Sequence, residues 1–169
     1  MSRAFLKDDA DLEGVIVPRR APLPDGTPNL VTPSGLARLE REHAELTAER
    51  DAVSADPDAP DRSRRLAGLS AALDELEGRL ASARVVPPPE APSGRVALGA
   101  TVTIRYADDG RDATFRIVGV DEADPDAARV AFTAPLADAV LEGRVGDEVR
   151  VSIGGTLRRL EIVACAYRD

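Results

Sequence analysis

The chain is poor in the residues from which most catalytic and metal centres are built. Its 169 residues include one cysteine, Cys165, one histidine, His43, and no tryptophan. A lone cysteine cannot form an internal disulfide, and a zinc site or a histidine-dependent triad needs more of these side chains. Glycine-rich phosphate loops and the nucleophile elbow of hydrolases are also absent from the sequence. We therefore do not expect a self-contained enzyme, and we expect the protein to reside in a reducing, cytoplasmic compartment.

Positive charge and long apolar runs are scarce as well. The 30 acidic and 22 basic residues leave a net charge of −8, which disfavours a protein that binds DNA or RNA through the phosphates. Nucleic acid would then be met only indirectly, through a partner protein. No stretch approaches the roughly 18 apolar residues of a membrane span, and the Met1–Phe5 start leads into acidic residues rather than a signal-peptide core. We expect no contact with membranes.

Two long segments carry the alternating three–four spacing of coiled-coil helices. Residues 1–30 contain four prolines and are expected to form an extended arm. Thr32 followed by Pro33 then predicts an N-cap and the first turn of a helix. The first stripe consists of Leu36, Leu39, His43, Leu46, Arg50 and Val53. The second consists of Leu66, Leu69, Leu73, Leu76 and Leu80. Because each stripe can bury the other, residues 31–85 are predicted to form an antiparallel helical hairpin.

The loop between the two stripes concentrates aspartate. Asp56, Asp58 and Asp61 lie in it, and the helix that follows begins with three arginines, Arg62, Arg64 and Arg65. One interpretation is structural, since aspartate is a common turn and cap residue. The other is functional: carboxylates at the end of a thin rod could enter a narrow site and recruit Mg²⁺ there, with Asp56 and Asp58 as ligands.

The remainder of the chain changes to the period of β-strands. Residues 86–93 are rich in proline and predict a stiff linker. In residues 94–169, apolar and polar side chains alternate in several short runs, which predicts a small antiparallel sheet. Pro135–Leu141 fits one short helix, Gly154–Gly155 fits a two-residue hairpin turn, and the loss of alternation at Arg158–Arg159 suggests a β-bulge. The fold class is therefore α+β.

The order of these parts resembles the Gre transcript-cleavage factors of bacterial RNA polymerase across roughly residues 31–169. The motifs that carry the resemblance are Thr-Pro-Ser-Gly-Leu at 32–36, Gly-Ala-Thr-Val-Thr at 99–103, Ile-Val-Gly-Val-Asp-Glu-Ala-Asp at 117–124 and Ala-Pro-Leu-Ala-Asp-Ala at 134–139. Two N-terminal runs, at 2–5 and 18–24, are similar to the extended start of some Gre-like proteins.

The resemblance implies an FKBP-like fold for residues 94–169, a domain that docks on the rim of the polymerase secondary channel. It also implies that the hairpin reaches toward the active site, where acidic tip residues help to hold an Mg²⁺ that belongs to the polymerase. Carried over by motif, the docking residues are Asp121, Glu122 and Pro135. Apart from the motif, Arg62, Arg64 and Arg65 near the tip could touch RNA or polymerase, although such arginines more often form a solvated helix face. No cofactor of the chain's own is implied, and a monomer is expected.

The tip departs from the family. Gre factors carry an Asp-Leu-x-Glu-Asn-x-Glu-Tyr type of motif there, whereas residues 55–62 read Ala-Asp-Pro-Asp-Ala-Pro-Asp-Arg. The hairpin is also shorter by roughly two turns per helix, which withdraws the tip by about 10 Å at about 1.5 Å per residue. Two functions at the channel stay open: stimulation of RNA cleavage, and occupancy without cleavage as in the Rnk-like regulators.

A prolyl isomerase of the FKBP type is a distant third possibility. Those active sites are lined with aromatic side chains, and this chain has only five. They are Phe5, Phe115, Phe132, Tyr106 and Tyr167.

Overall fold

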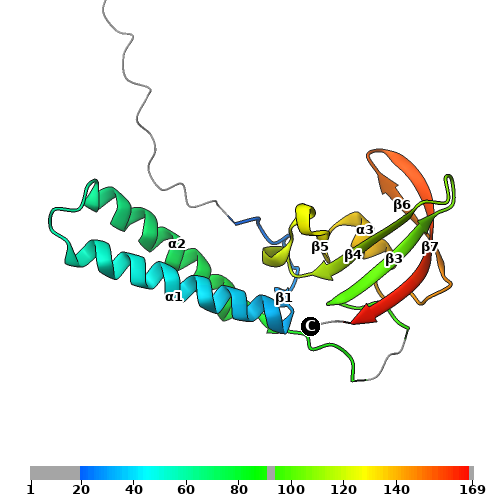
Figure 1. Cartoon of the computed structure of the whole chain (residues 1–169), viewed down its shortest axis with the longest axis horizontal. Helices are drawn as coiled ribbons and strands as arrows, with labels where there is room; N and C mark the ends of the chain where they lie inside the picture. Colours follow the sequence, from blue (N-terminus) through cyan, green and yellow to red (C-terminus); the bar gives the residue numbers. More distant parts are fainter. Residues whose placement is uncertain (1–19, 91–93, 168–169) are drawn as a thin grey trace, which may run out of the picture.

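The computed structural model describes residues 20–90 and 94–167 and consists of a helical hairpin joined to a curled β-domain (Figure 1). The helices are α1 (Pro33–Ala55), α2 (Arg62–Ser82) and α3 (Pro135–Val140), with two 3-10 turns, η1 (Val120–Glu122) and η2 (Pro125–Ala127). The strands are β1 (Leu30–Val31), β2 (Arg84–Val85), β3 (Ala100–Tyr106), β4 (Asp112–Val118), β5 (Arg129–Ala131), β6 (Glu148–Ile153) and β7 (Thr156–Tyr167). Residues 1–19 of the predicted arm lie outside the described residues.

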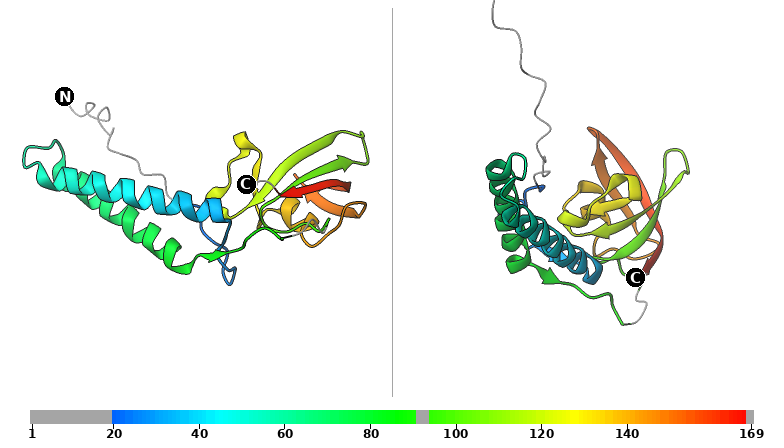
Figure 2. Two further views of the ribbon diagram at one scale, coloured as in Figure 1. Left: turned by 60° about the horizontal axis from the view of Figure 1, so that its bottom comes forward. Right: turned by 60° about the vertical axis from the view of Figure 1, so that its left-hand side comes forward.

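The predicted hairpin is confirmed. α1 and α2 pack side by side, and the turn between them lies at the end of the molecule farthest from the β-domain (Figures 1 and 2). Leu39, Val53, Leu69, Leu73 and Leu76 are buried along the seam, as the two leucine stripes require. At about 1.5 Å per residue, the 23 residues of α1 extend about 34 Å. Within the described part of the chain, neither long helix is apolar enough to span a membrane.

The β-domain is a five-stranded sheet in the order β5-β4-β3-β7-β6. Three of its four pairings are antiparallel, but β5 runs parallel to β4, so the prediction of a wholly antiparallel sheet is wrong at this edge. The physical reason is the connection: the chain passes through η1 and η2 after β4 and returns alongside it in the same direction. The turn at Gly154–Gly155 is confirmed, and both residues have positive φ, which glycine adopts without steric cost.

The predicted β-bulge is misplaced. The register of β3 against β7 shifts between Thr103, which faces Ala164, and Ile104, which faces Ile162. Val163 is therefore the extra residue, and Arg158–Arg159 pairs regularly with β6. The alternation of apolar and polar side chains is lost at residues 158–159 because Arg158 takes a core-side position. Its guanidinium there lies 5.1 Å from the ring centre of Tyr106.

The hairpin and the β-domain have separate apolar cores. The hairpin core contains Val31, Leu39 and Leu76, whereas the sheet core is built from strand residues such as Ile104 and Ile162. The two are joined by a parallel pair of two-residue strands, in which β1 faces β2. This small sheet positions the hairpin at the edge of the β-domain.

Candidate functional site

The hairpin tip presents exposed carboxylates. Asp56, Asp58 and Asp61 are all exposed. The Oδ1 atom of Asp56 accepts the backbone N–H of Asp58 at 3.0 Å, which closes the turn. Asp61 precedes α2 in a left-handed conformation, with φ at 49°, and its side chain does not cap the helix. Asp56 therefore has the structural role of a turn residue, while the carboxylates of Asp58 and Asp61 point to no partner in the described chain.

The three arginines after the loop differ in what they contact. Arg62 donates to the backbone oxygen of Ser54 at 2.8 Å, so it ties the start of α2 to the end of α1. Arg65 lies 3.4 Å from Glu49 on the facing helix. Arg64 is exposed, with no ion pair in the described part of the chain. Arg62 and Arg65 thus contact the facing helix of the hairpin, whereas Arg64 lies on the hairpin surface.

The tip does not form a metal site by itself. In residues 20–90 and 94–167, no group of three or more acidic, histidine or cysteine side chains is arranged to hold an ion. Mg²⁺ takes about six oxygen ligands and retains several waters. The two exposed carboxylates that have no bonding partner among the described residues, Asp58 and Asp61, are fewer than the ligands that such an ion needs.

At the opposite end of the hairpin, Glu122 lies inside the joint with the β-domain. Its side chain is 4% exposed, and its carboxylate accepts from the backbone N–H groups of Thr32 and Gly119, each at 3.0 Å. The hydroxyl of Thr32 donates to the same carboxylate at 2.5 Å, and it accepts the N–H of Gly35 at 3.0 Å. Glu122 is thus linked through Thr32 to the first turn of α1.

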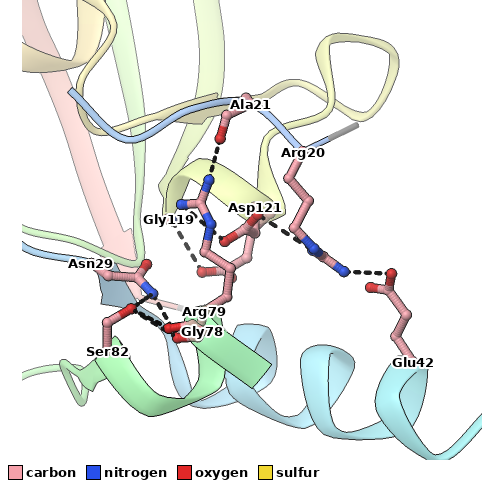
Figure 3. Close-up of polar contacts among 10 residues, drawn as sticks. Arg20, Ala21, Asn29, Glu42, Gly78, Arg79, Ser82, Gly119 and Asp121 are labelled. Carbon is pink, nitrogen blue, oxygen red and sulfur yellow. Dashed lines mark hydrogen bonds and ion pairs between the residues drawn. The ribbon is translucent and has the colours of Figure 1, made fainter. Parts of the chain in front are cut away.

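Asp121 occupies the neighbouring position between two arginines (Figure 3). Its side chain is 2% exposed and lies 3.3 Å from Arg20 and 3.7 Å from Arg79 of α2. Arg20 also pairs with Glu42 of α1 at 2.5 Å. Burial lowers the pKa of Arg20, but its hydrogen bonds and ion pairs with Glu42 and Asp121 outweigh this and raise it overall. Arg20 stays charged at any physiological pH.

These contacts bear on the docking role predicted for Asp121 and Glu122, which stays a prediction. Both were expected to touch a partner, but both carboxylates are buried and bonded within the chain. Within the chain, these two carboxylates link the hairpin and the base of the chain to the β-domain. Pro135, in contrast, is exposed at the first position of α3, where a partner can reach it.

Sequence reasoning missed the basic partners of this joint. Arg79 lies on the buried side of α2, donates to the backbone oxygen of Ala21 and is only 9% exposed. The sequence did indicate that Arg79 is buried, because residue 79 lies three positions after Leu76 and so continues the buried side of α2. Arg20 lies in the proline-rich arm, which has no periodicity from which its contacts could be read.

Comparison with known proteins gives the family. Among solved structures, a GreA/GreB elongation factor from Nitrosomonas europaea matches at 26% identity and a TM-score of 0.42, covering 82% of this chain and 98% of that one. The family model "Transcription elongation factor, GreA/GreB, C-term" matches residues 91–167. Transcription elongation factor GreA of Verminephrobacter eiseniae is 34% identical over 142 residues, covering 83% of this chain and 84% of the relative.

The chain belongs to the GreA/GreB family. GreA of Chloroflexus aurantiacus is 33% identical over 150 residues, which is 80% of this chain and 96% of that GreA. The match therefore includes helices as well as the β-domain, and the resemblance drawn from the sequence motifs is confirmed. As a GreA/GreB family member, the protein is a Gre-like transcription elongation factor.

Proposed function

We propose that this chain binds bacterial RNA polymerase at its secondary channel and regulates elongation by inserting the hairpin. The observation that carries the proposal is the shape of the hairpin: a rod about 34 Å long with exposed carboxylates at its far end and a β-domain at the other (Figure 1). Only such a rod brings charged groups into a narrow channel while a wider domain stays outside.

The proposal assigns a part to each region. Residues 94–169 would form the docking unit, with the exposed surface around Pro135 against the channel rim, and residues 86–93 would link it to the hairpin. Arg64, exposed beside the tip, would face the channel wall or the RNA. The protein would act as a monomer and meet nucleic acid only inside the polymerase.

In the first form of the proposal, the tip stimulates cleavage of backtracked RNA. Asp58 and Asp61 support this form, because their carboxylates are exposed and are not bonded to other described residues. They would complete the coordination of the polymerase's Mg²⁺ and thereby activate a water that attacks the RNA phosphate. The chain would then be no enzyme itself, since the polymerase supplies the metal and the cleavage site.

In the second form, the hairpin occupies the channel without cleavage and excludes other factors. The state of Asp56 supports this form, since its carboxylate already bonds within the turn. The short hairpin expected from the sequence also supports this form. A ligand must lie within about 2.1 Å of Mg²⁺, whereas a hairpin that is two turns shorter than in the Gre factors ends about 10 Å farther from the metal.

One assay on backtracked elongation complexes separates the two forms. If the tip stimulates cleavage, the wild-type chain releases short 3′ RNA fragments, and Asp58→Ala releases fewer, whereas Glu40→Ala, an exposed acid near the hairpin base, releases as many as wild type. If the hairpin only occupies the channel, the wild-type chain releases no RNA but displaces a cleavage-active GreA. The proposed function would be contradicted if the wild-type chain neither released RNA nor displaced GreA.

A further inference from the structure

The direction of the hairpin depends on few apolar contacts. The hairpin core and the sheet core are separate clusters, and a joint without a large apolar interface ordinarily leaves two parts free to move. Beside the joint lies a cavity of about 240 Å³, lined in part by Gly35, Glu42, Asp121 and Glu122. Direct packing of one core on the other therefore does not fix the angle between the two parts.

Residues Arg20–Val31, here called the base segment, run through this joint and contact both sides. Leu30 packs against the sheet core, while its neighbour Val31 is buried in the hairpin core with 1% exposure. The alternation of a β-strand directs these two adjacent side chains to opposite sides. Asn29 is 4% exposed, and its amide donates to the backbone oxygen of Arg79 at 2.9 Å.

The other end of the base segment contacts three elements through charge. Arg20 pairs with Glu42 of α1 and with Asp121 of η1, and Arg79 of α2 reaches Asp121 while donating to the backbone of Ala21 (Figure 3). Asp121 is thus the one carboxylate in this group shared by the base segment, the hairpin and the β-domain.

We propose that the base segment and Asp121 form a positioning device that fixes the direction of the hairpin relative to the β-domain. The device is internal to the chain and needs no partner. Only its consequence rests on the proposed function: a tip at the end of a rod about 34 Å long moves far when the base rotates slightly. Reaching one atom in a channel then requires a fixed base.

The test is a distance measurement between spin labels on the isolated full-length chain. One label is placed near the tip (Ser63→Cys) and one on α3 (Asp138→Cys), both exposed positions, in a Cys165→Ser background. We expect a narrow distance distribution in this parent. Arg20→Ala and Asp121→Asn should each broaden it by about twofold or more, because each substitution removes at least one ion pair that Asp121 makes across the joint.

Two controls separate loss of direction from loss of fold. Arg64→Ala removes an exposed arginine that has no ion pair within the described residues, and it should leave the distribution unchanged. Helical circular dichroism should be unchanged in Arg20→Ala, and this variant decides the matter if Asp121→Asn does not fold. An unaltered distribution in a folded Arg20→Ala chain would overturn the proposal.

A polymerase readout distinguishes this inference from the proposed function. If both hold, Arg20→Ala loses tip-dependent effects on the elongation complex while the protein still co-purifies with polymerase. If the labels show the broadening but wild type itself has no effect on polymerase, the positioning device stands and the proposed function fails.

Discussion

At the scale of single residues, the joint depends on the close fit between α1 and a buried carboxylate. A Cβ atom added to Gly35 would lie 2.1 Å from the carboxyl carbon of Glu122, which is far inside van der Waals contact. Glu122 cannot move away without losing its bonds to Thr32 and Gly119. The glycine in the Thr-Pro-Ser-Gly motif is therefore required by space rather than by backbone conformation.

Gly35→Ala should destabilise the protein by about 2 kcal/mol or more, as overpacking of a buried site does. Gly68→Ala is the matched control, because Gly68 lies in α2 and a Cβ atom added there would meet nothing within 4 Å. It should stabilise the protein by about 0.5–1 kcal/mol through helix propensity. Urea unfolding of both variants measures these changes, and an equal stability of the two would refute the steric account.

Cys165 gives a prediction for pH. Burial raises the pKa of its thiol, although a hydrogen bond with Tyr167 opposes the rise. A raised pKa means that the folded state favours the neutral thiol, so the fold loses stability as the pH rises past the thiol's ordinary value. The alkylation rate of the folded chain should therefore inflect at higher pH than that of the urea-unfolded chain. The same or a lower inflection in the folded chain would contradict this.

At the scale of elements, the helices could be predicted well and the sheet less well. The leucine stripes and the Thr32–Pro33 start defined α1 and α2, because local periodicity reports directly on a helical seam. The parallel placement of β5 depends on the path through η1 and η2, which no local pattern encodes. The bulge at Val163 had a signal in the sequence, since the core-side residues change from even positions, Leu160 and Ile162, to odd positions, Cys165 and Tyr167.

The stability of the hairpin should depend on its seam. Leu76 is fully buried, so Leu76→Ala should cost about 2–5 kcal/mol through lost burial and the cavity that remains. Leu157 is 67% exposed, and Leu157→Ala should change stability by less than about 0.5 kcal/mol. Thermal unfolding followed by helical circular dichroism compares the two, and similar midpoints would count against the leucine seam as the source of hairpin stability.

At the scale of the whole molecule, the two ends of the hairpin have different tasks. The tip exposes Asp58 and Asp61, and the base buries the carboxylates of Asp121 and Glu122. The tip acids were evident from the sequence because they cluster in a proline-containing turn. The burial of the base acids could not be predicted, because a motif shows which residues recur but not whether their side chains face a partner or their own chain. Their burial became visible only when α1, α2 and η1 were placed together.

The most direct test of the account is to locate the tip in a complex with bacterial RNA polymerase. A photoreactive group is attached at Pro57→Cys on the tip or, as control, at Leu157→Cys on the β-domain, both in a Cys165→Ser chain. Both positions are exposed. In backtracked complexes with labelled RNA, the account predicts that the tip group crosslinks to the RNA 3′ end or to the wall of the secondary channel, and that the control group does not reach the RNA. A tip group that forms no such crosslink, or no more than the control, would contradict it.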